Sequence, residues 1–429
     1  MQTVDVGIDF GTTNSSIARA TASGEVELAR FPSASGFLEA YRSLLYLDQL
    51  KERGVSRIRS WSGPAAIEEY LSAETKGRLV QSLKSFLSSR SLVSTDVFGR
   101  RMTLEDLIAR ILRDLRAHAE AQFGGRLENT VVGRPVRFVG AEKDEDNCFA
   151  EERLRRALDA AGFPNVQFEL EPVAAAQYYE SSLDHDELIL IGDFGGGTSD
   201  FSLLRVGPAI RRRGRAEGDL LGNSGVGIAG DAFDAKIVRN LVSPALGKGS
   251  SARSLNKVLP AVPNWVYAKL EHWHHLSFLR TGSTLHMLSS TRATAFEPHK
   301  IDALLHLIKE DLGYELHRAV QRTKCALSGD AEAQFRFSDG VIEIDAKVTR
   351  ADFEEWIGEE LAQIEACVDS LIAASGASCR DVDMVFLTGG TSFVPAVRRI
   401  FESRFGTARI RTGNEFTSVA RGLALKAAA

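Results

Sequence analysis

One short pattern occurs twice in this chain, and it constrains the fold more than any other feature of the sequence. The first copy is V-D-V-G-I-D-F-G-T-T at Val4–Thr13, where apolar residues alternate with small or polar ones before an aspartate and a glycine turn. The second copy is L-I-L-I-G-D-F-G-G-G-T-S-D at Leu188–Asp200. Period-two alternation predicts a strand, and glycine permits the tight turn that follows it. The repeat therefore predicts two similar lobes, each containing such a hairpin.

The turn residues of both copies suit the phosphates of a nucleotide. Asp9 and Asp193 stand at the predicted strand ends, and hydroxyls follow at Thr12, Thr13 and Thr198. Backbone amides of a glycine turn can hold anionic oxygens, and a carboxylate can hold Mg²⁺ directly or through its waters. A single Asp-x-Gly turn is only moderately specific, because many strands end this way. Its recurrence together with the threonine predicts two lobes that face one nucleotide.

The composition is that of an ordinary globular chain of two or three domains, with 429 residues, 44% of them hydrophobic and 25% charged. The formal net charge of -5 gives no broad electrostatic case for a nucleic-acid or membrane partner. The four cysteines show no C-x-x-C spacing, which is typical of free thiols in a reducing compartment. The sequence shows neither a signal-peptide pattern nor a run of about 18 apolar residues, so we expect a cytoplasmic protein.

Several helices can be predicted from their end signals and apolar spacing. Thr103-Leu104-Glu105-Asp106 has the form of a capping box that begins a helix, and Gly124-Gly125 ends it. Glu171-Pro172 opens another helix, because proline suits the first turn. Longer helices are predicted at Ile301–Leu327 and Thr349–Ala374.

Two further stretches have both a functional and a structural interpretation. The basic cluster Arg211–Arg215 could bind an anion, but we favour a solvated strand edge, since charge commonly protects an edge from pairing. Trp265–Leu279 carries His272, His274 and His275, yet it lacks acidic or cysteine partners at metal-ligand spacing. We therefore predict a packed aromatic helix there and not a metal site.

A third glycine turn, Gly389-Gly390, follows an apolar strand predicted at Asp383–Thr388. The three turns, in this order, resemble the phosphate-1, phosphate-2 and adenosine motifs of the actin, hexokinase and heat-shock ATPase superfamily. The residue sequences of these motifs are most similar to those of the heat-shock-70 (DnaK) family, and within it to those of the short YegD-type members. The motifs that carry this resemblance are G-I-D-F-G-T-T-N-S at Gly7–Ser15, L-K-S-F-L at Leu83–Leu87, E-P-V-A-A-A at Glu171–Ala176, G-D-F-G-G-G-T-S-D at Gly192–Asp200, A-L-S-G at Ala326–Gly329, L-T-G-G-T-S-F-V-P at Leu387–Pro395 and F-T-S-V-A-R-G-L-A-L at Phe416–Leu425.

The resemblance implies an α/β protein with the two-lobed actin-like ATPase fold, in which two ribonuclease-H-like lobes are duplicated. Lobe I is expected over residues 1–184, with the last helix, 412–429, returning to it. Lobe II is expected over 185–411. The sequence stops at Ala429, soon after the last motif, so we expect no peptide-binding domain.

The resemblance also implies roles for the matched residues. Asp9 and Asp193 match the carboxylates around the metal, and Lys84 matches the lysine that stabilises the transferring phosphoryl group. Glu171 matches the acidic residue on the metal's waters, and Thr198 matches the residue that lies near the γ-phosphate and the attacking water in the family. The phosphate loops correspond to Gly11, Thr12 and Thr13 in the first hairpin and Gly195, Gly196 and Gly197 in the second. The adenosine side corresponds to Gly230, Lys324, Ser328, Gly389 and Gly390, and Pro135 matches a proline that relays nucleotide state.

The motif context matters most for two of these residues. Taken alone, Lys84 is typical of a solvated surface lysine, and Glu171 is typical of a carboxylate at a helix N-terminus. Their chemistry nevertheless fits phosphoryl transfer, which needs a cation for the developing charge and an oriented water.

The sequence departs from the family pattern on the adenosine side. Cys325 and Phe393 stand where relatives place an arginine on each face of the adenine, and Gln321 and Phe416 replace acidic residues. Phe393 can still stack on a purine, so we include it among the predicted nucleotide-binding residues.

The sequence thus predicts a chaperone-related protein that binds ATP or ADP with Mg²⁺ and hydrolyses ATP slowly. We expect a monomer whose partners are the nucleotide and a protein client or co-factor protein, with no nucleic acid and no membrane. The alternatives are a nucleotide-sensing module with little turnover, a sugar-kinase-like phosphotransferase, and a polymerising actin-like protein. The products separate them: free phosphate, a phosphorylated acceptor, bound nucleotide without turnover, or nucleotide-dependent pelleting.

Overall fold

The computed structural model describes residues 3–21, 24–33, 36–52, 55–73, 77–254, 257–272, 276, 279–412 and 417–429. The chain forms two compact units, Met1–Gly230 with Ala362–Ala429, and Asp231–Leu361. Within the described ranges, no helix is both long and apolar enough to cross a membrane. The lobe boundaries predicted from the sequence, 1–184 with 412–429 and 185–411, stay a prediction.

The first unit contains a sheet that begins with the first predicted hairpin. Strands β1 (Thr3–Phe10) and β2 (Asn14–Ala20) are antiparallel, as predicted. The sheet order is β13-β12-β1-β2-β3, with β12 parallel to β1 and β13 parallel to β12. The remaining strands of this sheet are β3 (Val26–Leu28), β12 (Arg126–Arg134), β13 (Val166–Leu170) and β6 (Tyr41–Arg42), which pairs with β2.

The second sheet of the same unit repeats this topology. Strands β14 (Glu187–Phe194) and β15 (Ser199–Val206) form the second hairpin, and β16 (Leu220–Val226) continues it antiparallel. Strand β21 (Met384–Thr388) is parallel to β14, and β22 (Ile410–Thr412) is parallel to β21. Apart from β6, both sheets therefore consist of three antiparallel strands in chain order followed by two parallel ones, which confirms the duplicated α/β fold.

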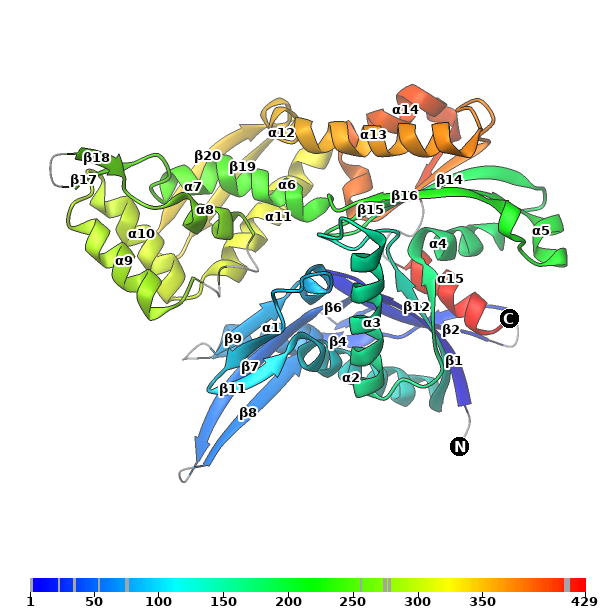
Figure 1. Ribbon diagram of the computed structural model, residues 1–429, viewed down its shortest axis with the longest axis horizontal. Helices are drawn as coiled ribbons and strands as arrows, with labels where there is room; N and C mark the ends of the chain where they lie inside the picture. The colour runs from blue at the N-terminus through cyan, green and yellow to red at the C-terminus, as the bar shows by residue number, and fades with distance from the viewer. Residues whose placement is uncertain are drawn as a thin grey trace. The chain divides into compact units, whose positions relative to one another are not determined.

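Helices cover these sheets, and two of them bring small residues into close contact. The ribbon view shows α15 (Ser418–Ala427, red) beside α4 (Glu171–Glu180) (Figure 1). A Cβ added at Gly422 of α15 would lie 1.7 Å from the Ala174 carbonyl oxygen of α4. A Cβ added at Gly7 of β1 would lie 2.2 Å from the Ala424 amide nitrogen. Backbone contact of this kind fixes α4, and with it Glu171 at its first position.

The other elements of the first unit complete its layers. Helix α2 shows the predicted capping box of Thr103 and Asp106, and it ends at Gly124 with φ +72. Its apolar face packs in one core cluster with β1, β12 and α3. The helical segments are α1 (Gly63–Ser72), η1 (Leu83–Phe86), α2 (Leu104–Phe123), α3 (Asp144–Ala161), α5 (Pro208–Arg213), η2 (Glu217–Asp219), η5 (Gly390–Phe393), α14 (Pro395–Phe405) and η6 (Thr407–Arg409). The small sheets comprise β4 (Phe31–Ser33), β5 (Gly36–Leu38), β7 (Leu44–Glu52), β8 (Val55–Ser62), β9 (Arg78–Gln81), β10 (Ser94–Val97) and β11 (Arg100–Thr103).

The second unit is mostly helical, with two small antiparallel pairs of strands, β17 with β18 and β19 with β20. Helix α6 begins at Gly230 and α13 continues past Leu361, so both helices extend into the first unit. The elements are α6 (Gly230–Ile237), η3 (Val238–Val242), α7 (Ser243–Ala245), β17 (Ser251–Ser254), β18 (Lys257–Pro260), α8 (Asn264–Glu271), α9 (Gly282–Arg292), α10 (Pro298–Lys309), α11 (Gly313–Gly329), β19 (Glu332–Ser338), β20 (Glu343–Thr349), α12 (Arg350–Trp356) and α13 (Gly358–Ser375).

Two long helices predicted from the sequence are each interrupted. The helix predicted at Ile301–Leu327 is split between α10 and α11, where Asp311 adopts φ +53. A left-handed residue ends a helix, and aspartate tolerates that conformation better than most side chains. The helix predicted at Thr349–Ala374 is split between α12 and α13 at Ile357-Gly358.

Two structural interpretations also need correction. The basic cluster is no strand edge, because Pro208 opens the short helix α5, which contains Arg211, Arg212 and Arg213. The packed helix predicted at Trp265–Leu279 ends at Glu271 as α8. His274 and His275 lie outside the described residues.

Candidate functional site

The two hairpins present equivalent aspartates at the ends of their first strands. Asp9 is the second-last residue of β1, and Asp193 is the second-last residue of β14. Both side chains are partly buried. The second turn is closed by the Gly195 amide, which donates to the Thr198 carbonyl at 2.9 Å. In the first turn, a Cβ at Gly11 would lie 2.1 Å from the Asn14 carbonyl oxygen, so a larger residue would open the turn.

The two turns lie against each other at Gly197. A Cβ added there would be 3.5 Å from the Thr12 hydroxyl oxygen and 3.4 Å from the Ser85 hydroxyl oxygen. It would lie only 2.7 Å from a methyl carbon of Val139, which is closer than real side chains come. The absence of a side chain at Gly197 therefore lets the first hairpin, the second hairpin and η1 converge. Thr12 is buried, whereas Thr13, Gly196 and Thr198 are partly exposed and Gly195 is exposed.

Lys84 belongs to this convergence. It lies on the short 3₁₀ helix η1, which follows Ser82 in the left-handed conformation with φ 54. Its Nζ donates to Oε1 of Glu171 at 2.5 Å, and the two residues are only 7% and 6% exposed. The alternative of a solvated surface lysine is therefore wrong. Glu171 occupies the first turn of α4, as expected for a carboxylate at a helix N-terminus. It also forms a buried ion pair with Lys84, so it interacts with more than the end of the helix.

Burial and neighbouring charges shift the pKa values of the groups around Lys84. Burial, and secondarily the Glu171 carboxylate, raises the pKa of Asp9 to about 7, against the attraction of Lys84. Burial and the same neighbour raise the pKa of Asp193 well above its usual value. Burial alone would lower the pKa of Lys84, but the carboxylates of Glu171 and Asp9 outweigh it and raise that pKa, so the ammonium stays charged.

Asp200 also belongs to the cluster, although it is not among the site residues that the motifs predict. Its buried Oδ1 accepts hydrogen bonds from the amides of Val136 at 2.7 Å and Arg137 at 3.2 Å. Burial and then Glu171 raise the pKa of Asp200 to about 7. Asp200 pairs with Asp193 across the hairpin, so the register of a tight hairpin could have revealed it. The hydrogen bond from the Val136 amide also connects the second hairpin to the segment that follows Pro135.

Four carboxyl groups, those of Asp9, Glu171, Asp193 and Asp200, thus share one lysine. Among the residues that the structure describes, no three His, Cys, Asp or Glu side chains could hold a metal ion by themselves. Carboxylates such as these can hold a divalent cation through its waters. This donor set and the glycine cradle at Gly197 fit a magnesium-bound polyphosphate.

The third predicted turn adjoins the second hairpin. Thr388 pairs with Asp193 at the ends of the parallel strands β21 and β14. Gly389 follows with φ +87, and a Cβ there would lie 2.0 Å from the Phe194 carbonyl oxygen, so only glycine fits. Gly390 begins η5, and Phe393 at its end is 45% exposed. The Phe393 ring is therefore accessible and not part of the core.

The remaining predicted residues lie on helices α6 and α11. Gly230 is the buried first residue of α6. Lys324 of α11 forms an ion pair with the buried carboxylate of Asp234 at 2.7 Å. The Ser328 hydroxyl donates to the Lys324 carbonyl at 3.2 Å, within the same helix. Gln321 is partly buried and Cys325 exposed on α11, and Phe416 lies outside the described residues.

The duplicated sheets, with their paired hairpins and convergent turns, define an actin-like ATPase fold. Comparison with known families specifies it further. The family model described as "Hsp70 protein" matches residues 60–254 and 297–429, which is more than half of the chain. The chain therefore belongs to the Hsp70 family.

Curated relatives agree with this assignment. The chain is 24% identical to "Chaperone protein DnaK" of Thermotoga petrophila over 425 residues, covering 99% of this chain and 59% of that protein. It is 25% identical to the DnaK chaperone of Thermosipho africanus, covering 99% of this chain and 58% of the relative. For the DnaK chaperone of Deinococcus radiodurans, the identity is 24%, with 98% of this chain and 59% of the relative covered. The chain thus spans less than two thirds of the length of these relatives.

Proposed function

We propose that this protein binds ATP with Mg²⁺ at the convergence of its two hairpins and slowly hydrolyses it to ADP and phosphate. The observation that carries this proposal is a group of four buried or partly buried carboxyl groups that, among the described residues, share the cation of Lys84 where two glycine turns meet. Buried like charges are unfavourable unless a cation joins them. A magnesium-bound nucleotide supplies that cation and brings phosphates for the turns to hold.

Each residue of the convergence then has a part in binding or chemistry. The turns at Gly11–Thr13 and Gly195–Thr198 would offer amides and hydroxyls to the phosphate oxygens. Asp9 and Asp193 would hold the waters of the metal. Bound Mg²⁺ would neutralise the phosphate charge that builds up during transfer. Lys84, kept protonated by its neighbours, would stabilise the γ-phosphoryl group, and Glu171 and Thr198 would orient the attacking water.

Further parts of the proposal follow from the relatives, which carry the name of a chaperone. We infer a chaperone-related role of the YegD-like kind in the cytoplasm, with a protein client or co-factor protein as partner. Gly389, Gly390 and Phe393 of the first unit would contact the nucleoside, and the adenosine-side roles of Gly230, Lys324 and Ser328 stay a prediction. Product analysis tests the reaction: free phosphate supports hydrolysis, and a phosphorylated acceptor would favour a kinase. Binding without turnover would favour a nucleotide-sensing module.

Asp9→Asn and Asp193→Asn test whether these carboxylates help to hold Mg²⁺. Each substitution removes one negative charge and changes the side-chain volume little. We expect each variant to bind ATP about tenfold more weakly with Mg²⁺, while binding in excess EDTA changes little, since only the metal-dependent part is lost. Asp5→Asn is the matched control. It lies on the same strand as Asp9, but its carboxylate accepts from Asn129 and stands apart from the cluster. Unchanged Mg²⁺-dependent affinity in both site variants would remove the metal role from these carboxylates.

A further inference from the structure

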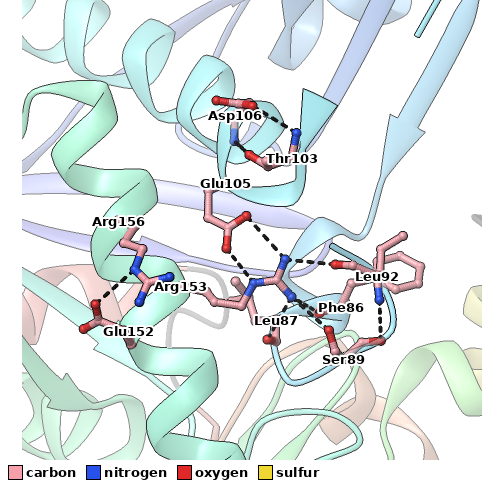
Figure 2. A network of polar contacts seen from close by, with 10 residues as sticks. All are labelled: Phe86, Leu87, Ser89, Leu92, Thr103, Glu105, Asp106, Glu152, Arg153 and Arg156. Carbon is pink, nitrogen blue, oxygen red and sulfur yellow. Dashed lines mark hydrogen bonds and ion pairs between the residues drawn. The ribbon is translucent and has the colours of Figure 1, made fainter. Parts of the chain in front are cut away.

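Behind the lysine-bearing turn lies a buried arginine that the proposed chemistry does not use. Arg153 of α3 is 3% exposed, and its guanidinium points into the segment that follows Lys84 (Figure 2). Its Nη1 donates to the carbonyls of Phe86 at 3.3 Å, Leu87 at 3.4 Å and Ser89 at 3.0 Å. Its Nη2 donates to the Leu92 carbonyl at 3.0 Å. One side chain therefore binds four carbonyls of a single loop.

These contacts provide hydrogen-bond donors for backbone carbonyls of the loop. Residues 83–92 form a 3₁₀ turn and a loop, and Arg153 supplies donors to four carbonyls of this segment. Buried carbonyls without donors are strongly disfavoured. Arginine is suited to several acceptors at once, because its planar fork carries five N–H groups in fixed directions. A lysine ammonium could not reach the same four oxygens from one position.

Arg153 is itself held in place from the opposite side. Its Nε donates to Oε1 of Glu105 at 2.7 Å and its Nη2 to Oε2 at 3.3 Å, a bidentate pair. Glu105 lies in the first turn of α2, whose start is fixed by the capping box of Thr103 and Asp106. Although burial works against it, the hydrogen bond from Arg153 keeps the pKa of Glu105 below its usual value. The loop is thereby anchored to two long helices, α2 and α3.

The anchor reaches Lys84 through a short stretch of backbone. The Leu87 amide donates to the Lys84 carbonyl at 3.2 Å, and the Leu87 carbonyl accepts from Arg153. The Ser89 amide donates to the Phe86 carbonyl at 3.0 Å, and that carbonyl also accepts from Arg153. Any shift of the loop is therefore transmitted to the backbone of Lys84.

From these contacts we infer that Arg153 is a positioning residue that sets the location of the Lys84 ammonium opposite Glu171. This inference rests on the proposed hydrolysis, in which Lys84 acts on the γ-phosphoryl group. Misplacement of a reacting group by about 1 Å can reduce a rate by about 100-fold, while binding that depends on other contacts persists. Arg153 therefore affects the hydrolysis rate through Lys84 and leaves ATP affinity nearly unchanged.

The test uses Arg153→Lys, which keeps the positive charge but lacks the planar guanidinium and its five N–H donors. Arg156→Lys is the matched control, because Arg156 lies on the same helix and pairs with Glu152 at the surface, their side chains being 60% and 51% exposed. We expect Arg153→Lys to lower the single-turnover rate about 10- to 100-fold with nearly wild-type ATP affinity. Glu105→Gln, a milder change, should lower the rate less. Arg156→Lys should have no effect.

Combination with Lys84→Met separates positioning from general loss of stability. If Arg153 acts through Lys84, Arg153→Lys has no further effect on the residual rate once Lys84 is absent, although it still lowers the melting temperature. An equal loss of rate in both backgrounds overturns the inference, and so does a wild-type rate in Arg153→Lys.

Hydrogen exchange of the peptide 83–92 gives a readout that needs no turnover. Arg153→Lys should speed exchange there relative to Arg156→Lys. Unchanged exchange overturns the anchor even if the wild type hydrolyses ATP. If the wild type shows no turnover while Arg153→Lys exchanges faster, the proposed hydrolysis is wrong, but the anchoring of the loop by Arg153 is supported.

Discussion

Replacement of Lys84 by methionine tests the chemical part of the proposal most directly. The side chains are similar in length, so packing is largely kept, but the only cation shown within the carboxylate cluster is lost. Glu171 then keeps a buried charge whose partner stood 2.5 Å away. Removing one partner of a buried ion pair destabilises a protein by about 3–5 kcal/mol. We therefore expect a lower melting temperature without nucleotide, and partial recovery of it when MgATP binds.

Catalysis should be affected separately from stability. One preorganised electrostatic donor contributes about 10²–10³-fold to a rate, or roughly 3–4 kcal/mol of transition-state stabilisation. Lys84→Met should therefore lose steady-state hydrolysis while ATP still binds, since the interaction forms mainly in the transition state.

The assay compares single-turnover rates and nucleotide affinity on the same preparations. The double variant Lys84→Met/Glu171→Gln removes the uncompensated carboxylate, so it should regain stability but not hydrolysis. Wild-type turnover in Lys84→Met would refute the catalytic role of the lysine. If the wild type itself gives no turnover above buffer, the enzyme interpretation fails and a nucleotide-sensing module takes its place.

Two further predictions concern the base and the packing of the site. Phe393→Ala should weaken ATP and GTP binding similarly, by about 1–3 kcal/mol, if the exposed ring stacks on the purine. A competition assay measures the affinities, with Phe37→Ala, at another exposed phenylalanine, as the control. A nucleotide-bound structure in which Phe393 lies away from the base would contradict the prediction. Gly422→Ala should lower the free energy of unfolding by about 1–3 kcal/mol or more, because its Cβ would lie 1.7 Å from the Ala174 carbonyl. Gly329→Ala, where a Cβ meets nothing within 4 Å, is the thermal-melting control, and equal melting points would show that α4 and α15 can separate.

Local signals predicted a large part of the fold correctly. Both hairpins, the capping box of α2 and the helix that opens at Glu171-Pro172 occur where the sequence predicts them. These features depend on neighbouring residues, such as a glycine in a turn or a threonine three residues before an aspartate. Their physical causes are therefore visible in a short stretch of sequence.

The errors occur where the backbone departs from a regular pattern without a strong signal. The interruption at Asp311 lies within a run of apolar residues at helical spacing, and that spacing predicts one continuous helix. The charge of the basic cluster predicts a solvated strand edge, but the proline at Pro208 opens a helix there.

The sequence by itself determined the chemistry available to this protein: two aspartates after strands, glycine turns with hydroxyls, and a lysine and a glutamate in recognisable motifs. Only the tertiary structure decided which of these groups share one environment. It buried Lys84 against Glu171, 87 residues away, added Asp200 to the cluster, and placed Arg153 behind the loop that carries the lysine. The physical reason is that burial and ion pairing depend on distances between segments remote in the chain, which local propensity does not encode.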